Sequence, residues 1–249
     1  MQPERQSRET LGTVRHAAQL FQLLSEGPAH HQLTDLAERS GMSLPTVHRL
    51  LRSLVAAGLV EQDPRSLRYG LGPELVLLAE RYLERLPVLN ALSPYLVELR
   101  NLTKATVLVA LLIGRSIVYA DRIEGDAYGD RFRESHRCHD ALETAAGRVL
   151  LANASLEAWT EAVERAPHGC YSEEDRRAWA QSPYVLTRQE LPEALALEIA
   201  VPVRDANGCV RAALSATASP HLFPDDFDDA VGLQLSRVAR LAGRALGAG

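Results

Sequence analysis

The strongest fold signal in the N-terminal part of this chain is the stretch 33–60, LTDLAERSGMSLPTVHRLLRSLVAAGLV. Apolar residues recur at helical spacing on both sides of Gly41, which predicts two short helices joined by a tight turn. Glycine favours the left-handed conformation that follows a helix end, so Gly41 marks the end of the first helix, with Thr34 as its expected N-cap. Ser43 is placed to cap the second helix, which we expect to run to about Ala57.

The second helix separates an apolar from a polar face. Its apolar stripe consists of Val47, Leu50, Leu51, Leu54 and Val55. The opposite side carries Thr46, His48, Arg49, Arg52 and Ser53, and no acidic residue occurs between Ser43 and Ala57. A helix-turn-helix with an acid-free polar face on its second helix is typical of proteins that read the DNA major groove.

The flanking segments complete a winged helix-turn-helix. A first helix is predicted from apolar residues on one stripe: Leu11, Val14, Ala18, Phe21 and Leu24. After Gly58, residues 59–62 and 67–69 are predicted to form a hairpin, with Arg65 at its tip and Arg68 on its flank. A wing of this kind places arginines beside phosphates or in the minor groove. A small helical bundle with merely solvated arginines is the alternative, but the turn, the acid-free face and the wing together favour DNA binding.

The charge is divided between the two parts of the chain. The 249 residues carry a formal net charge of −5, yet residues 1–72 hold eight arginines against seven acids, while residues 73–249 hold nineteen basic against twenty-five acidic residues. A cation-leaning head on an acidic body is consistent with one domain that meets a polyanion. Lys104 is the only lysine, so phosphate contacts would depend on arginine.

Composition also bears on location. The N-terminus lacks an apolar signal-peptide core, and no uninterrupted apolar stretch approaches the ~18 residues of a membrane span. The three cysteines, Cys138, Cys170 and Cys209, are odd in number and far apart, which fits a reduced cytoplasm better than a disulfide scaffold. We therefore expect a cytoplasmic protein without membrane contact.

A linker helix is expected after the glycines and proline of residues 69–73. Residues 74–86 have apolar side chains on one face, which must be buried either on the C-terminal domain or on a second chain. A single winged-helix head reads only a few base pairs, and two-fold pairing supplies a second half-site. We expect a homodimer at minimum.

The remainder predicts a mixed sheet covered by helices, so the whole chain is assigned to the α+β class. Strands are expected at 105–113, 116–123, 184–189, 197–204 and 209–217, and helices at 144–153, 156–165, after Ser172 and at 225–246. No phosphate-binding loop, nucleophile elbow or zincin motif occurs, so we predict neither an enzyme nor a cofactor. Two alternatives remain open: an enzyme acting on a small metabolite with an appended helical head, and a winged helix used as a protein-interaction module.

The motifs resemble those of the IclR family of bacterial transcription regulators. The resemblance rests on residues 33–42, on Thr-Val-His-Arg-Leu-Leu at 46–51, on Ala-Gly-Leu-Val at 57–60 and on Tyr-Gly-Leu-Gly at 69–72. It implies a DNA-binding domain at 1–72, a linker helix at 73–90 and a GAF-like effector-binding domain at 91–249, in dimers or tetramers that repress or activate transcription at a double-stranded DNA operator. Where the family usually has Pro-Lys-Ser, this chain has Ser43-Leu44-Pro45, so no operator sequence carries over. The candidate DNA contacts are Ser43, Pro45, Thr46, His48, Arg49, Arg52, Arg65 and Arg68.

The candidate effector site begins at a helix start. Thr144, Ala145 and Ala146 would present unpaired amides to an anion such as a carboxylate. By the resemblance, Glu198, Ser215 and Thr217 face the effector pocket, and Arg188 stands where the family commonly has an acid. A ligand with a carboxylate and a donor group, held by Arg188 or the helix start and by Glu198, is one hypothesis. The other is an Arg188–Glu198 salt bridge that closes the pocket.

A separate group of side chains has the chemistry to bind a metal. It comprises His136, Cys138, His139 and Asp140, with His168 and Cys170 further on. The spacing is not that of a structural zinc site. We predict no metal.

Overall fold

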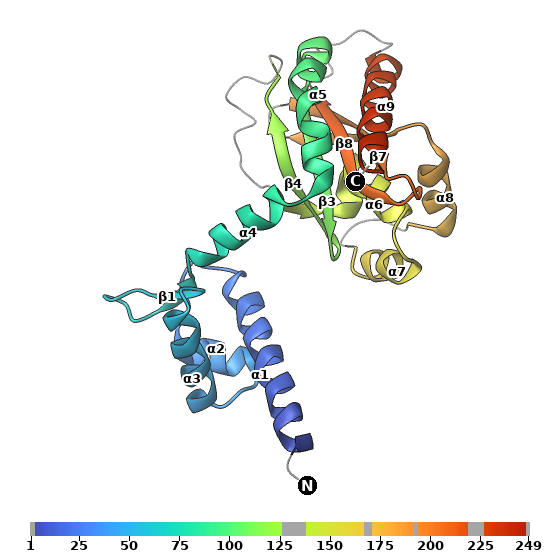
Figure 1. Cartoon of the computed structure of the whole chain (residues 1–249). Coiled ribbons are helices and arrows are strands. Elements are labelled where there is room, and N and C mark those ends of the chain that lie inside the picture. Colours follow the sequence, from blue (N-terminus) through green and yellow to red (C-terminus); the bar gives the residue numbers. More distant parts are fainter. Residues whose placement is uncertain (1–2, 126–137, 167–170, 192–193, 219–226, 248–249) are drawn as a thin grey trace. The chain divides into compact units, whose positions relative to one another are not determined.

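The computed structural model describes residues 3–125, 138–166, 171–191, 194–218 and 227–247. It divides into two compact units, Met1–Leu83 and Glu84–Gly249. Helices form most of the first unit, and a six-stranded sheet covered by helices forms the second (Figure 1). This is the expected combination of a winged helix-turn-helix with a mixed α/β domain, and it confirms the α+β class.

The first unit packs three helices against a short hairpin. The helices are α1 (Pro3–Leu24), α2 (Leu33–Ser40) and α3 (Leu44–Ala56), and β1 (Val60–Gln62) pairs with β2 (Tyr69–Leu71) in antiparallel fashion. Helix α4 (Glu74–Glu84) follows the hairpin. The core is formed by fully buried side chains, chiefly Leu20, Leu36, Val47 and Leu51.

The turn between α2 and α3 is built as the sequence predicts. Gly41 has a φ of 68°, and its amide donates to the Glu38 carbonyl at 3.2 Å. The expected N-cap of α2 is wrong, because Gln32 occupies that position and Thr34 lies inside the helix. Ser43 is at the N-cap of α3, but its hydroxyl pairs with the Thr46 hydroxyl at 2.8 Å instead of capping a backbone amide.

The buried stripe of α1 also differs from expectation. Val14 is 66% exposed and Ala18 is exposed, whereas Leu20 and Leu24 are buried. The physical reason is that α2 and β2 pack against the C-terminal half of this helix. Helical spacing alone identifies an apolar stripe, but it does not say how far along the helix the core extends.

The second unit is organised around one antiparallel sheet with strand order β5-β4-β3-β8-β7-β6. Its strands are β3 (Thr106–Ile113), β4 (Ser116–Ile123), β5 (Cys138–Asp140), β6 (Val185–Leu191), β7 (Ala194–Arg204) and β8 (Val210–Ala218). All five expected strands are present. The short edge strand β5 was not expected, and neither was the helix α5 (Pro87–Thr103), which begins at Pro87 and tolerates Pro94 within it.

Helices cover both faces of this sheet. Helix α5 and the last helix, α9 (Phe227–Ala245), lie side by side on one face (Figure 1). The other face packs on α6 (Ala145–Ala152), which shares a core with Ala110, Ala200 and Ala213 of the strands. The short 3-10 helix Ala141–Glu143 precedes α6, while α7 (Leu156–Glu164) and α8 (Glu173–Gln181) pack beside it. Helix α8 follows Ser172 as expected, and a Ser172–Asp175 capping box forms its start. The face on α6 is the one that carries the candidate site.

Candidate functional site

The polar face of α3 is presented as a recognition helix requires. Val47, Leu50 and Leu51 are buried, so the side chains between them turn outward. Most of the predicted contact residues of this helix are exposed, and Thr46 is half-buried; the exposed set is Ser43, Pro45, His48, Arg49 and Arg52. The surface predicted from the sequence is therefore accessible to a partner.

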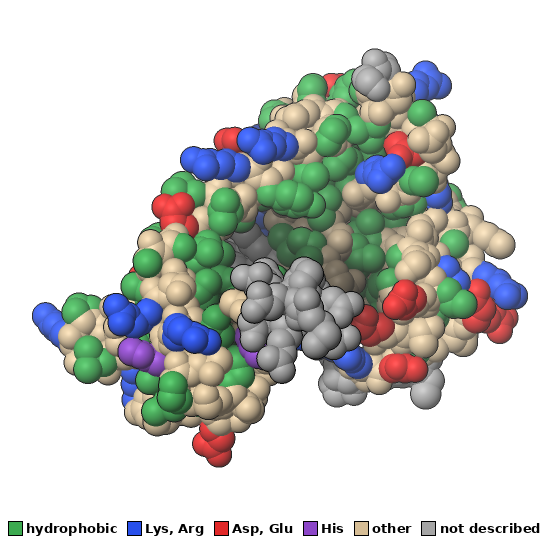
Figure 2. Space-filling view, turned by 60° about the horizontal axis from the view of Figure 1, so that its bottom comes forward, with side chains coloured by type: hydrophobic (Ala, Val, Ile, Leu, Met, Phe, Trp, Pro, Cys, Tyr) green, Lys and Arg blue, Asp and Glu red, His purple; other side chains and the backbone are tan. Residues whose placement is uncertain are grey.

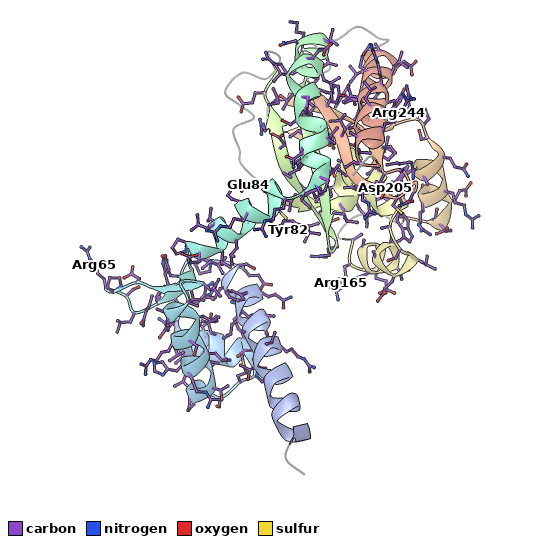
Figure 3. The ribbon with its side chains drawn as sticks, in the orientation of Figure 1. Arg65, Tyr82, Glu84, Arg165, Asp205 and Arg244 are labelled. Atoms are coloured by element: carbon purple, nitrogen blue, oxygen red, sulfur yellow. The ribbon has the colours of Figure 1, made fainter. Side chains whose placement is uncertain are left out.

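The hairpin holds its arginines clear of the domain. The Asp63 carboxylate accepts hydrogen bonds from the amides of Arg65, at 2.6 Å, and Ser66, at 2.9 Å, which shapes the loop between β1 and β2. Those backbone hydrogen bonds lower the pKa of Asp63. The Arg65 side chain projects from the loop (Figure 3), and Arg68 is also exposed.

The arginines of this surface differ from Arg39 in the same unit. Among the described residues, Arg49, Arg52, Arg65 and Arg68 form no ion pairs, whereas Arg39 pairs with Glu26 at 2.8 Å and with Asp35 at 3.7 Å. Basic side chains reach the surface at the left of the space-filling view, where this unit lies (Figure 2). Unpaired guanidinium groups need not break an internal contact before they meet a phosphate or a base.

The second candidate site is a set of buried polar side chains on the α6 face of the sheet. Strand register places Thr187, Glu198, Thr217 and Thr106 directly opposite one another on four neighbouring strands. All four are buried, as is Ser215, two residues before Thr217 on β8. Residues two apart on a strand share a face, so these five side chains lie on one side of the sheet.

Glu198 lies at the centre of this polar set. Its Oε2 accepts a hydrogen bond from the Ala145 amide at 2.8 Å, and its Oε1 accepts one from the Tyr119 hydroxyl at 2.9 Å. Thr144 caps α6 by accepting from the Gly147 amide at 3.0 Å. The helix start that we expected to hold a ligand carboxylate therefore already holds the carboxylate of Glu198.

Burial governs the ionisation of this pair. It raises the pKa of Glu198, an effect that the hydrogen bonds from Tyr119 and from the Ala145 and Ala146 amides partly oppose. It also raises the pKa of Tyr119, and the neighbouring Glu198 charge adds to that rise. The Glu198 charge thus disfavours ionisation of Tyr119, whereas the neutral Tyr119 hydroxyl favours the ionised form of Glu198.

Two buried hydroxyls near Glu198 lack hydrogen-bond partners. They are Thr187 Oγ1 and Ser215 Oγ, on the strands that flank β7. Ser215 nevertheless lies near enough to the carboxylate to contribute to lowering its pKa. Buried polar groups in proteins are usually paired, so unpaired ones need an explanation.

The role expected of Arg188 is wrong. Arg188 is exposed and lies opposite Leu197, while Glu198 lies opposite Thr187, so the two charged side chains belong to opposite faces of the sheet. No ion pair joins them, and Arg188 is not among the residues gathered around Glu198. Adjacent residues of a strand point to opposite faces of the sheet, so Thr187, and not Arg188, lies on the same face as Glu198.

The structure adds residues that the sequence did not indicate. Tyr119, on β4, and Thr187, on β6, lie beside Glu198. Tyr119 is 79 positions away from Glu198 in the chain. Alternation along β4 puts Ile117 and Tyr119 on one face, but only the strand order identifies which face that is.

The group of side chains weighed for metal binding is described only in part. His136, His168 and Cys170 lie outside the described residues; Cys138 is exposed, and the His139 ring packs edge-on against Tyr119, with ring centroids 5.7 Å apart. Across the part of the chain that the structure describes, no three His, Cys, Asp or Glu side chains are grouped so as to hold a metal ion. Within the same residues, no helix is long and apolar enough to cross a membrane.

Comparison with known proteins decides the family. Residues 13–64 match the IclR helix-turn-helix domain, and residues 80–241 match the C-terminal domain of the bacterial transcriptional regulator IclR. The chain belongs to the IclR family. Its relatives are named as transcriptional regulators, so this member of the IclR family is a DNA-binding transcriptional regulator and not an enzyme.

Individual members of the IclR family are similar to this chain along most of their length. The Escherichia coli regulator XynR is 29% identical over 213 residues, which are 82% of this chain and 84% of XynR. An IclR transcriptional regulator from a Silicibacter species superposes with a TM-score of 0.76 at 25% identity, covering 95% of this chain and 97% of the other. An IclR homologue from Microbacterium hydrocarbonoxydans, solved in complex with 4-hydroxybenzoate, superposes with a TM-score of 0.64 at 19% identity, covering 92% of this chain and 99% of the other.

Replacing Tyr119 with phenylalanine tests the ionisation of Glu198 in this IclR-family member. Loss of the hydroxyl donor should raise the pKa of Glu198 further above its ordinary value of 4.5. A carboxyl group whose pKa is raised in the folded state stabilises most below its unfolded pKa, and this contribution is lost as pH rises through the folded pKa. As pH rises above the unfolded-state pKa and through the folded-state pKa of Glu198, we expect the variant to lose more stability than the wild type, by about the 1.5–3 kcal/mol of a hydrogen bond to a charged group.

Urea unfolding at a series of pH values measures this difference. In a Glu198→Gln background, which has no carboxylate to titrate, the same Tyr119→Phe change should add no pH dependence. Parallel stability profiles for the wild type and Tyr119→Phe would show that the hydroxyl does not control the ionisation of Glu198.

Proposed function

We propose that this regulator binds a near-palindromic operator as a dimer, under the control of a small molecule bound by its C-terminal unit. The observation that carries the DNA half is the surface of α3 and the hairpin, where exposed arginines without ion pairs among the described residues flank an acid-free helix. Such a helix fits the major groove, and the hairpin follows the adjacent backbone. Thr46, His48, Arg49 and Arg52 are assigned to the groove, with Ser43 and Pro45 at its edge, and Arg65 and Arg68 to the hairpin contacts.

Helix α4 supports the dimer. No side chain of this helix is buried in the described chain. Four of its apolar side chains are between 49% and 63% exposed: Val76, Leu77, Leu78 and Tyr82. Tyr82 extends from the helix in Figure 3. Apolar surface of this extent on one helix is characteristic of an interface, and a second copy of α4 would cover it by two-fold symmetry.

Replacing Leu78 with glutamate is expected to weaken self-association at least about tenfold, because a charge would be buried where two apolar helices meet. Sedimentation velocity over a range of concentrations measures the change. Leu156→Glu is the matched control, since Leu156 is 62% exposed on α7 and distant in sequence from α4. Equal dissociation constants for the two variants would remove α4 from the interface.

Effector control is assigned to the polar set around Glu198. The relative solved with 4-hydroxybenzoate has the same fold and binds a small organic molecule. For a ligand to regulate DNA binding, its affinity must differ between a DNA-competent and a DNA-incompetent arrangement of the two heads. Linkage then requires that operator DNA changes the ligand affinity by the same factor.

Genome-wide mapping of bound sites, followed by titration of the recovered sequences, tests this proposal. A duplex with two half-sites should bind much more tightly than one with a single half-site, and binding should fall steeply with salt. Sequence preference at fixed salt separates operator reading from general attraction to a polyanion. Equal affinity for one and two half-sites would contradict the dimeric reading of the operator.

A further inference from the structure

Glu198 is a buried carboxylate to which no described side chain is ion-paired. It is 4% exposed, and it accepts hydrogen bonds from the neutral Tyr119 hydroxyl and the Ala145 amide. Arg122 also faces this side of the sheet, opposite Leu108 on β3, but its guanidinium pairs with Glu124 at 3.6 Å. Removing a charge from water is costly unless an opposite charge or a full set of hydrogen bonds replaces the lost solvent.

Two buried hydroxyls beside Glu198 also need hydrogen-bond partners. Thr187 lies directly across from Glu198 on β6, and Ser215 is diagonal to it on β8. Both side chains are at least nine-tenths buried, and both oxygens lack a hydrogen-bond partner. A hydroxyl oxygen can accept a hydrogen bond, so the site offers acceptors from three neighbouring strands and one negative charge.

A carboxylate ligand does not fit this arrangement. The amide at the start of α6, which would otherwise attract an anion, is engaged by Glu198 at 2.8 Å. A second carboxylate beside it would bring two like charges together in a buried site, which disfavours ionisation of both.

We propose that the small molecule sensed by this unit is an organic cation, of the primary ammonium class, held by Glu198 with Thr187 and Ser215. An ammonium group carries three donors and no acceptor, so it can bond to the carboxylate and to both hydroxyls at once. Its positive charge also provides the counterion that the described residues do not supply. This inference rests on the assignment of the polar set as the effector site in the proposed function.

Titration calorimetry of the full chain with compounds matched in skeleton but opposite in charge tests the proposal. The pairs are benzylammonium with phenylacetate, 1,4-butanediammonium with adipate, and ethanolammonium with 3-hydroxypropanoate. We expect at least one ammonium compound to bind the wild type, its carboxylate counterpart not to bind, and Glu198→Gln to weaken ammonium binding at least tenfold. Glu164→Gln, which removes an exposed carboxylate from α7, should leave binding unchanged.

Glu198→Ala provides a second readout. This change vacates the start of α6, so the carboxylate compounds should bind the variant more tightly than they bind the wild type. The proposal is overturned if the wild type prefers the carboxylate of a pair, if Glu198→Gln binds ammonium as well as the wild type does, or if no ammonium compound binds.

Operator titrations separate these failures from failure of the proposed function. Carboxylates that bind the wild type and shift its operator affinity would contradict the cation inference and uphold ligand control. Sequence-specific operator binding with no response to any of the six compounds would contradict the cation inference and leave the DNA-reading half of the proposed function intact.

Discussion

Replacing Arg49 with alanine is expected to weaken operator binding by about 1–3 kcal/mol, or roughly 5- to 150-fold. Arg49 is exposed on α3, on the side opposite the buried Val47 and Leu51, and forms no ion pair with any described residue. Its planar guanidinium can bond to two acceptors of one guanine edge, and alanine loses both bonds. Because the side chain supports nothing in the core, stability should change little.

Two further variants make the Arg49 measurement decisive. Arg177→Ala removes the same charge from the exposed surface of α8, so it controls for general electrostatics and should leave operator affinity nearly unchanged. Arg49→Lys keeps the charge but lacks the planar guanidinium. If Arg49 contacts a base, this variant should bind the operator as weakly as Arg49→Ala; if Arg49 contacts a phosphate, its operator affinity should recover. Fluorescence anisotropy at one salt concentration measures all three, and an unchanged midpoint for Arg49→Ala would remove this residue from the groove.

Replacing Gly147 with alanine is expected to destabilise the C-terminal unit by at least about 3 kcal/mol. A Cβ atom at this position would lie 2.5 Å from Ala141 Cα and 2.6 Å from its carbonyl carbon, and would overlap the carbonyl oxygen. The obstructing atoms are backbone, so they cannot rotate away as a flexible side chain would. Displacing the start of α6 would also pull the Ala145 amide from Glu198 and leave the buried carboxylate without that hydrogen bond.

Gly114→Ala is the matched control in the same unit. Gly114 has a φ of 60°, and a methyl group added there would meet no atom within 4 Å, so alanine adds only backbone strain of about 1–2 kcal/mol. The two tryptophans of the chain, Trp159 and Trp179, both lie in this unit, 5.8 Å apart between ring centroids. Their fluorescence during urea unfolding therefore reports on this unit, and a Gly147→Ala midpoint equal to that of Gly114→Ala would show that α6 can shift freely.

The candidate DNA-binding surface was largely predictable because its determinants are local. The acid-free face of α3, the left-handed Gly41 and the arginines of the hairpin follow from spacing within about forty residues of sequence. The errors in this unit, Thr34 as an N-cap and Val14 as a core residue, concern where an element starts and how far the core reaches. Those details depend on the neighbours that an element meets, which local spacing does not contain.

The candidate ligand site was predictable only in part. Thr144, Ala145, Glu198, Ser215 and Thr217 do come together: Thr144 and Ala145 were identified from the helix start, and Glu198, Ser215 and Thr217 from the resemblance to the family. The contact between Glu198 and the start of α6 was not predicted, because it joins residues 53 positions apart through the packing of a helix on a sheet.

By itself, the sequence determined that a winged helix-turn-helix precedes a mixed α/β domain, and which arginines face outward from the recognition helix. Periodicity and capping encode these properties within single elements. Only the tertiary structure decided that Glu198 fills the helix start, that Tyr119 and Thr187 join it, and that Arg188 lies on the opposite face. Strand order and register set those relations, and a one-residue difference in register moves a charge from the buried side of the sheet to solvent.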